Sequence, residues 1–73
     1  MIDMTYDPEA DAVYLRLSRG KVAATDEAGP FIYDVDAEGR VLGIEILTAS
    51  KTLAPGDWQK ARLPGQASID AAE

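Results

Sequence analysis

The fold of this chain is decided by residues 31–47, FIYDVDAEGRVLGIEIL. Two runs rich in β-branched and aromatic residues flank a short polar link, which is the pattern of a β-hairpin. The link suits a type I turn followed by Gly39 in the left-handed region, a hairpin loop with a bulge. We therefore expect the facing pairs Asp36–Arg40, Val35–Val41, Tyr33–Gly43 and Phe31–Glu45. The Tyr33 ring would then lie over Gly43 and protect the bare backbone there.

In this register both faces of the hairpin are apolar. One face carries Ile32, Leu42, Ile44 and Ile46, and the other carries Phe31, Tyr33, Val35, Val41 and Leu47. A sheet with one face in water normally shows a clean alternation of apolar and polar residues instead. A second copy of the chain is the simplest cover, because symmetric two-fold pairing is the commonest form of oligomer. The residues expected at an interface with a second copy or a partner are Phe31, Tyr33, Val35, Val41, Leu47 and Trp58.

Upstream of the hairpin, residues 2–7 and 13–18 alternate apolar and polar side chains and are expected to form two antiparallel strands. Facing Tyr6 with Val13 gives them one wholly apolar face, and a slip of one residue would mix the faces. Residues 21–26 form a third, weaker strand that would lie beside the second. The sequence therefore predicts a mainly β (α+β) fold, a single antiparallel meander sheet of four to five strands.

A short C-terminal helix is expected after the sheet. Residues 48–53 can form it, with Thr48 as the N-cap. Pro55 ends it, because proline disfavours the helical region for the residue before it. Residues 57–62 could add one more turn, which carries Trp58.

A chain of 73 residues is long enough for one domain only. We expect a β-meander domain with its short helix over residues 1–54 and a C-terminal extension over residues 55–73, of which residues 66–73 fray. No apolar run approaches the roughly 20 residues of a membrane span, and no basic segment leads a signal peptide. The chain is therefore expected in the cytoplasm, without a membrane partner.

The charged residues number 13 acidic and 7 basic, which gives a formal net charge of −6, and the chain has neither Cys nor His. Nucleic-acid binding depends on clustered Lys and Arg, so nucleic acid is not expected as a partner. Without Cys and His the chain lacks thiolate nucleophiles, the usual zinc ligands and the side chain that titrates near neutral pH. An enzyme is therefore the less favoured interpretation, and no cofactor is expected.

Two acidic stretches invite a metal-site interpretation. The first has nearly the spacing of a calcium-binding EF-hand loop and consists of Asp34, Asp36, Glu38, Gly39 and Glu45. The second could bind magnesium or do acid–base work and consists of Asp7, Glu9 and Asp11. An EF-hand loop works between two helices, whereas strands flank this one. In both stretches we favour turns that need Asp and Gly for their geometry, and we assign no catalytic or metal role.

Glu45 is expected on the same face as Phe31 and Tyr33, where an ionised carboxylate is costly without a partner. Arg16 or Lys21 could pair with it, or the sheet edge could leave it in water.

The most specific motifs of the chain are three segments, MTYDPEADAVYLRL (4–17), DVDAEGRVLGIEIL (34–47) and ASK (49–51). In combination they resemble a small prokaryotic family known as domain-of-unknown-function family 2283, DUF2283. The resemblance covers about residues 1–53 and implies a compact β-rich domain with a helical C-terminal element and no established activity or cofactor. It also implies gene neighbours that are small basic proteins suspected of being toxins, which an acidic partner would suit.

Two hypotheses about function follow. The first is a small acidic protein-interaction module that self-associates as a homodimer or higher assembly and acts, like an antitoxin, as the acidic partner of a small basic protein. The second is a metal-dependent small-molecule binder or enzyme that uses carboxylates at a subunit junction. The missing catalytic residue types and the charge of −6 favour the first.

Overall fold

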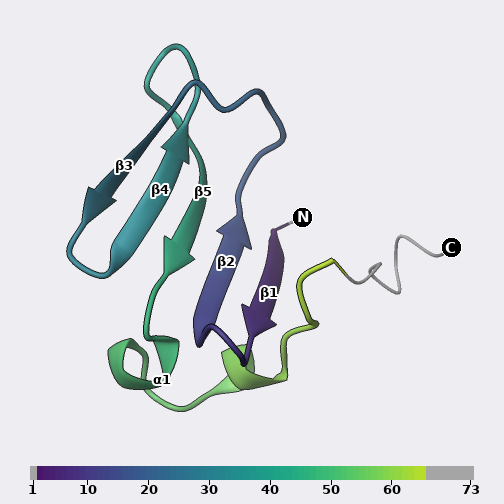
Figure 1. Cartoon of the computed structure of the whole chain (residues 1–73). Helices are drawn as coiled ribbons and strands as arrows, with labels where there is room; N and C mark the ends of the chain where they lie inside the picture. The colour runs from purple at the N-terminus through teal and green to yellow at the C-terminus, as the bar shows by residue number, and fades with distance from the viewer. Residues whose placement is uncertain (1, 66–73) are drawn as a thin grey trace, which may run out of the picture.

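The computed structural model describes residues 2–65 and shows one antiparallel sheet (Figure 1). Its five strands lie in the order β1-β2-β5-β4-β3. Their bounds are β1 Asp3–Asp7, β2 Ala12–Arg16, β3 Ala24–Ala28, β4 Phe31–Val35 and β5 Val41–Ile46. A short helix, α1 (Ala49–Thr52), and a 3-10 turn, η1 (Asp57–Lys60), follow the sheet. The expected mainly β fold with a short C-terminal helix is confirmed.

The strand order departs from a simple meander after β2. The predicted strand over residues 21–26 beside β2 is wrong, because β3 pairs with β4 at the far edge of the sheet and β5 lies beside β2. The β2–β5 pairing sets Val13 against Ile46 and leaves Val13 only 1% exposed. Residues 21–26 have mostly small side chains and could not bury as much apolar surface beside β2 as β5 does.

The β1–β2 hairpin has the predicted register, with Tyr6 opposite Val13 and Asp3 opposite Arg16. In the β4–β5 hairpin the turn is as predicted: the Asp36 N–H donates to the Arg40 carbonyl at 2.9 Å and Gly39 has a φ of 83°.

Beyond the turn the predicted register of this hairpin is wrong by one residue. Val35 faces Val41, but Asp34 faces Gly43, so Val41 and Leu42 take the place of one residue in a β-bulge. The later pairs of the hairpin are Tyr33–Ile44, Ile32–Glu45 and Phe31–Ile46.

The bulge gives the sheet a single apolar face, and the interpretation of a sheet apolar on both faces is wrong. Tyr33 and Phe31 now lie on the same face as Ile44 and Ile46, because directly opposite residues share a face. The β2–β5 register adds Val13 and Leu15 to this face. The other face carries mainly polar side chains, among them Tyr14, Glu45 and Asp34.

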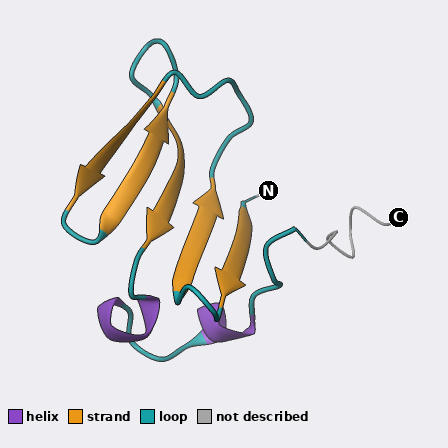
Figure 2. Ribbon diagram, in the orientation of Figure 1, coloured by secondary structure: helices purple, strands orange, loops and turns teal. Residues whose placement is uncertain are grey.

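The chain covers one end of this apolar face itself. Both helical turns lie at the same end of the sheet (Figure 2). Ala49 of α1 is fully buried and packs with Val13 and Ile46. Leu53 and Trp58 add to this core, and the Tyr6 and Trp58 rings meet edge to face at a centroid distance of 5.0 Å.

The predicted N-cap of α1 is wrong. Thr48 has a left-handed φ of 51° and its side chain makes no cap hydrogen bond. Asp11, in the β1–β2 turn, takes that role: its carbonyl accepts from the Ala49 N–H at 2.8 Å and its carboxylate accepts from the Ser50 N–H at 3.1 Å. The helix is therefore fixed by a residue distant in sequence, which local capping rules do not reveal.

Among residues 2–65 no helix is long and apolar enough to cross a membrane. The predicted fraying of residues 66–73 lies outside the described residues.

Candidate functional site

Part of the apolar face of the sheet is left uncovered by α1 and η1. Six side chains line a shallow depression of about 440 Å³ there, and polar atoms take no part in its lining. They are Leu15, Phe31, Tyr33, Val41, Ile44 and Ile46, and we call them the open apolar surface. Phe31 and Val41 are each 39% exposed. Apolar surface of this kind on a soluble protein commonly marks an interaction site.

The structure brings three of the six sequence-predicted interface residues together on this surface: Phe31, Tyr33 and Val41. Val35 is buried at 8% exposure, and Trp58 packs on Tyr6 within the chain. Leu47 is 38% exposed but does not line the open apolar surface. The role of these residues at an interface stays a prediction.

Leu15 and Ile44 belong to the open apolar surface and were missed as interface candidates. The sequence contained the signal: when both faces of a hairpin look apolar, shifting the register of one strand by one residue brings both apolar sets to the same face. A bulge beside the Gly39 turn supplies that shift.

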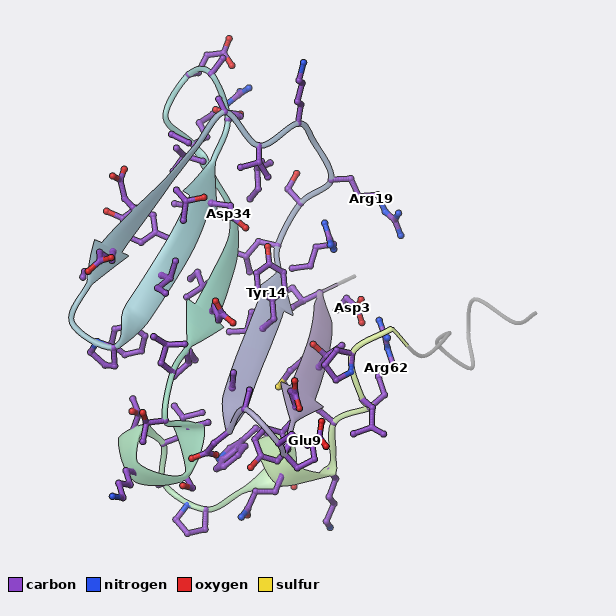
Figure 3. All side chains as sticks on the ribbon, in the orientation of Figure 1. Asp3, Glu9, Tyr14, Arg19, Asp34 and Arg62 are labelled. Atoms are coloured by element: carbon purple, nitrogen blue, oxygen red, sulfur yellow. The ribbon has the colours of Figure 1, made fainter. Side chains whose placement is uncertain are left out.

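On the polar face, the side chains of Tyr14, Asp34 and Thr25 form a clamp across the sheet, and Figure 3 labels the first two. The Tyr14 hydroxyl of β2 donates to Asp34 Oδ2 of β4 at 2.8 Å, and the Thr25 hydroxyl of β3 donates to Asp34 Oδ1 at 2.9 Å. To reach Asp34, Tyr14 lies over Gly43 of β5, where an added Cβ would be 2.1 Å from the tyrosine oxygen. An aromatic ring over Gly43 was expected, but it is Tyr14 and not Tyr33.

Burial raises the pKa of Tyr14, and its hydrogen bond to Asp34 raises it further. The Arg16 guanidinium lies 5.7 Å from the centre of the Tyr14 ring and opposes this shift. Glu45 lies opposite Tyr14 on this polar face, so its expected position among apolar side chains is wrong. The one-residue register shift is the reason.

Next to this clamp a hollow of about 410 Å³ opens between β1, β2 and the chain near Arg62. Asp3 pairs with Arg62 at its rim, as Figure 3 shows. Arg16 and Glu45 also line it. The hollow is therefore lined by charges of both signs.

In the acidic stretch of the β1–β2 turn, the carboxylates of Asp7 and Asp11 accept hydrogen bonds from other residues of the chain. Asp7 Oδ1 accepts from the Glu9 N–H at 3.0 Å, as in an Asx turn. Asp11 Oδ1 accepts from the Tyr6 hydroxyl at 2.9 Å, and Oδ2 accepts from the Ser50 hydroxyl at 2.6 Å. The Ser50 hydrogen bond, followed by that of Tyr6, lowers the pKa of Asp11. The bond to Asp11 in turn raises the pKa of Tyr6.

The stretch with EF-hand spacing forms the β4–β5 turn. Asp36 Oδ1 accepts from the Glu38 and Arg40 N–H groups at 2.9 Å each, and Oδ2 pairs with Arg40 Nε at 2.9 Å. The backbone bond from Arg40 is the main cause that lowers the pKa of Asp36. Glu45 pairs with Ile32 far along the hairpin. Within residues 2–65 no group of three or more carboxylates is placed so that it could hold a metal ion.

No curated protein and no solved structure matches the chain. The family model described as "Protein of unknown function (DUF2283)" matches residues 3–50, which include all five strands of the sheet. The chain therefore belongs to the DUF2283 family.

Proposed function

We propose that this protein is an acidic interaction module that self-associates through its open apolar surface. The observation that carries the proposal is the half-covered sheet face: α1 and η1 pack over Val13 and Ile46, whereas Phe31 and Val41 on the same face remain 39% exposed. The occupant is a second copy, because a two-fold axis through the surface would set two identical apolar patches together.

The size of the surface sets the expected strength. Three strands about 4.8 Å apart and about 17 Å long present roughly 250 Å² in projection. Two such surfaces bury less than the roughly 1,200 Å² of a standard stable interface. We therefore expect a dissociation constant on the order of 10 to 100 µM for the dimer.

Sedimentation velocity over about 5 to 500 µM tests this, because the range spans the expected dissociation constant. The mass should rise from 7.8 kDa toward twice that value, 15.6 kDa. Phe31→Lys and Val41→Lys should each remain monomeric at every concentration. Both side chains are exposed enough for the fluorescence of the single tryptophan to stay unchanged.

Two matched lysine variants serve as controls. Val22 and Leu47 are 49% and 38% exposed and do not line the open apolar surface, so Val22→Lys and Leu47→Lys should associate like the parent protein. Each variant changes the net charge by the same amount. A parent protein that stays monomeric at 500 µM, or Phe31→Lys that associates like Val22→Lys, would refute the proposal.

The second part of the proposal is a basic protein partner, as for an antitoxin-like module. The net charge of −6 supports it, since an acidic surface speeds association with a basic one. Recovery of the native protein from its source by an affinity tag, at low and high salt, tests this part. A salt-sensitive basic protein in the complex is the expected result, and the tagged chain alone at low salt would contradict it.

A further inference from the structure

The two edges of the sheet differ. Beside β1, the Tyr6 N–H donates to the Arg62 carbonyl at 3.0 Å and Thr5 pairs with Arg62, so the chain covers part of that edge itself. Strand β3 pairs with β4 on one side only, and all five of its residues are exposed. Figure 1 shows β3 at the margin of the sheet with none of the described chain beside it.

The backbone of β3 can accept another strand. A link of Gly29 and Pro30 joins β3 to β4, and the pair next to it is Ala28–Phe31. In such a hairpin the pair beside the turn exchanges both backbone bonds, and the pattern alternates from there. The N–H and C=O groups of Glu27 and Thr25 therefore face outward.

The side chains of this edge are acidic on both faces. Asp26 faces Tyr33 and lies on the apolar-face side, whereas Glu27 faces Ile32 on the polar side. Among residues 2–65 neither carboxylate has an ion-pair partner. The flanking Ala24 and Ala28 are small and leave room beside them for long side chains.

The charges of Asp26 and Glu27 favour a basic strand over a second copy of β3 as the occupant of this edge. If two β3 strands paired antiparallel about Asp26, that residue would face its own copy, and like charges directly opposite destabilise a sheet. A strand with Lys or Arg at two adjacent positions would instead place one cation beside Asp26 and the next, on the opposite face, beside Glu27.

We propose that β3 is a docking edge for an extended basic segment of another protein, which adds to the sheet as a sixth strand. Main-chain hydrogen bonds to Thr25 and Glu27 provide the attachment, and Asp26 and Glu27 select for positive charge. The docking edge is the outer backbone of β3 and not the open apolar surface, so the inference does not depend on self-association; it rests on the second part of the proposed function and gives the basic partner a place on the fold.

The probe is a short synthetic peptide with two adjacent central lysines between alternating Thr and Val, titrated into the full ¹⁵N-labelled chain. The amides of Thr25 and Glu27 should shift and exchange more slowly with solvent. Glu27→Pro removes an outward N–H that β4 does not use, and edge strands tolerate proline. This variant should weaken binding at least tenfold, as should the double change Asp26→Lys and Glu27→Lys.

The matched control is Glu9→Lys, an exposed carboxylate in a distant turn, which should bind the peptide within twofold of the parent. A peptide with two glutamates in place of the lysines should not bind. The monomeric Val41→Lys variant, whose new charge lies on β5 and not beside β3, should still bind the lysine peptide, which separates this edge from the dimer surface. Equal binding by Glu27→Pro, equal loss in Glu9→Lys, no binding of the lysine peptide, or binding of the glutamate peptide would each overturn the proposal.

Discussion

Replacement of Gly43 by alanine should collapse the clamp on the polar face of the sheet. The new Cβ would lie 2.1 Å from the Tyr14 oxygen, 2.6 Å from Cζ of the same ring and 3.0 Å from the Leu15 carbonyl oxygen. The carbonyl belongs to the β2 backbone and cannot move far, so Tyr14 must leave. Its hydrogen bond to Asp34 is then lost.

The expected cost follows from these contacts. A hydrogen bond to a charged group contributes about 1.5 to 3 kcal/mol, and the alanine regains roughly 0.5 to 1 kcal/mol of backbone entropy. We therefore expect the free energy of unfolding to fall by about 1.5 kcal/mol, which for a urea slope near 1 kcal/mol per M lowers the midpoint by about 1.5 M.

Urea unfolding followed by fluorescence of the single tryptophan, Trp58, measures this at a fixed protein concentration. In a Tyr14→Ala background the obstructing ring is gone, and Gly43→Ala should cost less than about 1 kcal/mol. Gly56→Ala is the matched control, because an added Cβ there meets neighbours only at 3.9 Å. Equal costs of Gly43→Ala with and without the Tyr14 ring would refute the clamp.

Three further predictions concern the rest of the fold. Because hydrogen bonds lower the pKa values of Asp11 and Asp36 below their unfolded values, stability should hold down to about pH 5 and fall below about pH 4; Asn at both positions should flatten this acid limb in urea titrations. Because the pKa of Tyr14 is raised, its contribution should be complete below about pH 10 and vanish as the pH rises through the folded value, and Tyr14→Phe should remove that loss. Trp58→Ala should lower the free energy of unfolding by about 2 kcal/mol, since a half-buried ring contributes less than a core one. A chain ended after residue 54 should have a lower melting temperature by circular dichroism, and an unchanged melting temperature would show that η1 does not stabilise the core.

Local signals in the sequence predicted the β1–β2 hairpin and the β4–β5 turn, but not the pairing of β3 with β4. The β1–β2 register follows from alternation around Tyr6 and Val13, because a slip would expose the apolar set. The β4–β5 turn follows from Asp36 and Gly39, whose roles are built into the turn type. Both depend on residues close in sequence, where short-range rules decide the structure.

Long-range choices were not predictable in the same way. Whether β3 or β5 lies beside β2 depends on how much surface Val13 buries against Ile46, which no local pattern records. The bulge at Val41 moves every later pair of the hairpin by one residue, and a one-residue error inverts the faces. The cap of α1 likewise comes from Asp11, far away in sequence.

The candidate interface was therefore predicted in part. Phe31, Tyr33 and Val41 were expected at the interface because the assumed register placed them on one apolar face, and the observed register keeps them together. Leu15 and Ile44 joined them only once the bulge and the β2–β5 pairing were known. Trp58 was expected at an interface with a second copy or a partner, and it packs on Tyr6 within the chain.

The most direct test of a shared apolar face is an isotope-filtered NOE spectrum of a mixture of ¹³C-labelled and unlabelled chains at high concentration. The account predicts contacts between the Phe31 ring of one copy and the Ile44 or Val41 methyl groups of another. A folded protein in which these groups show contacts only within their own chain would contradict it.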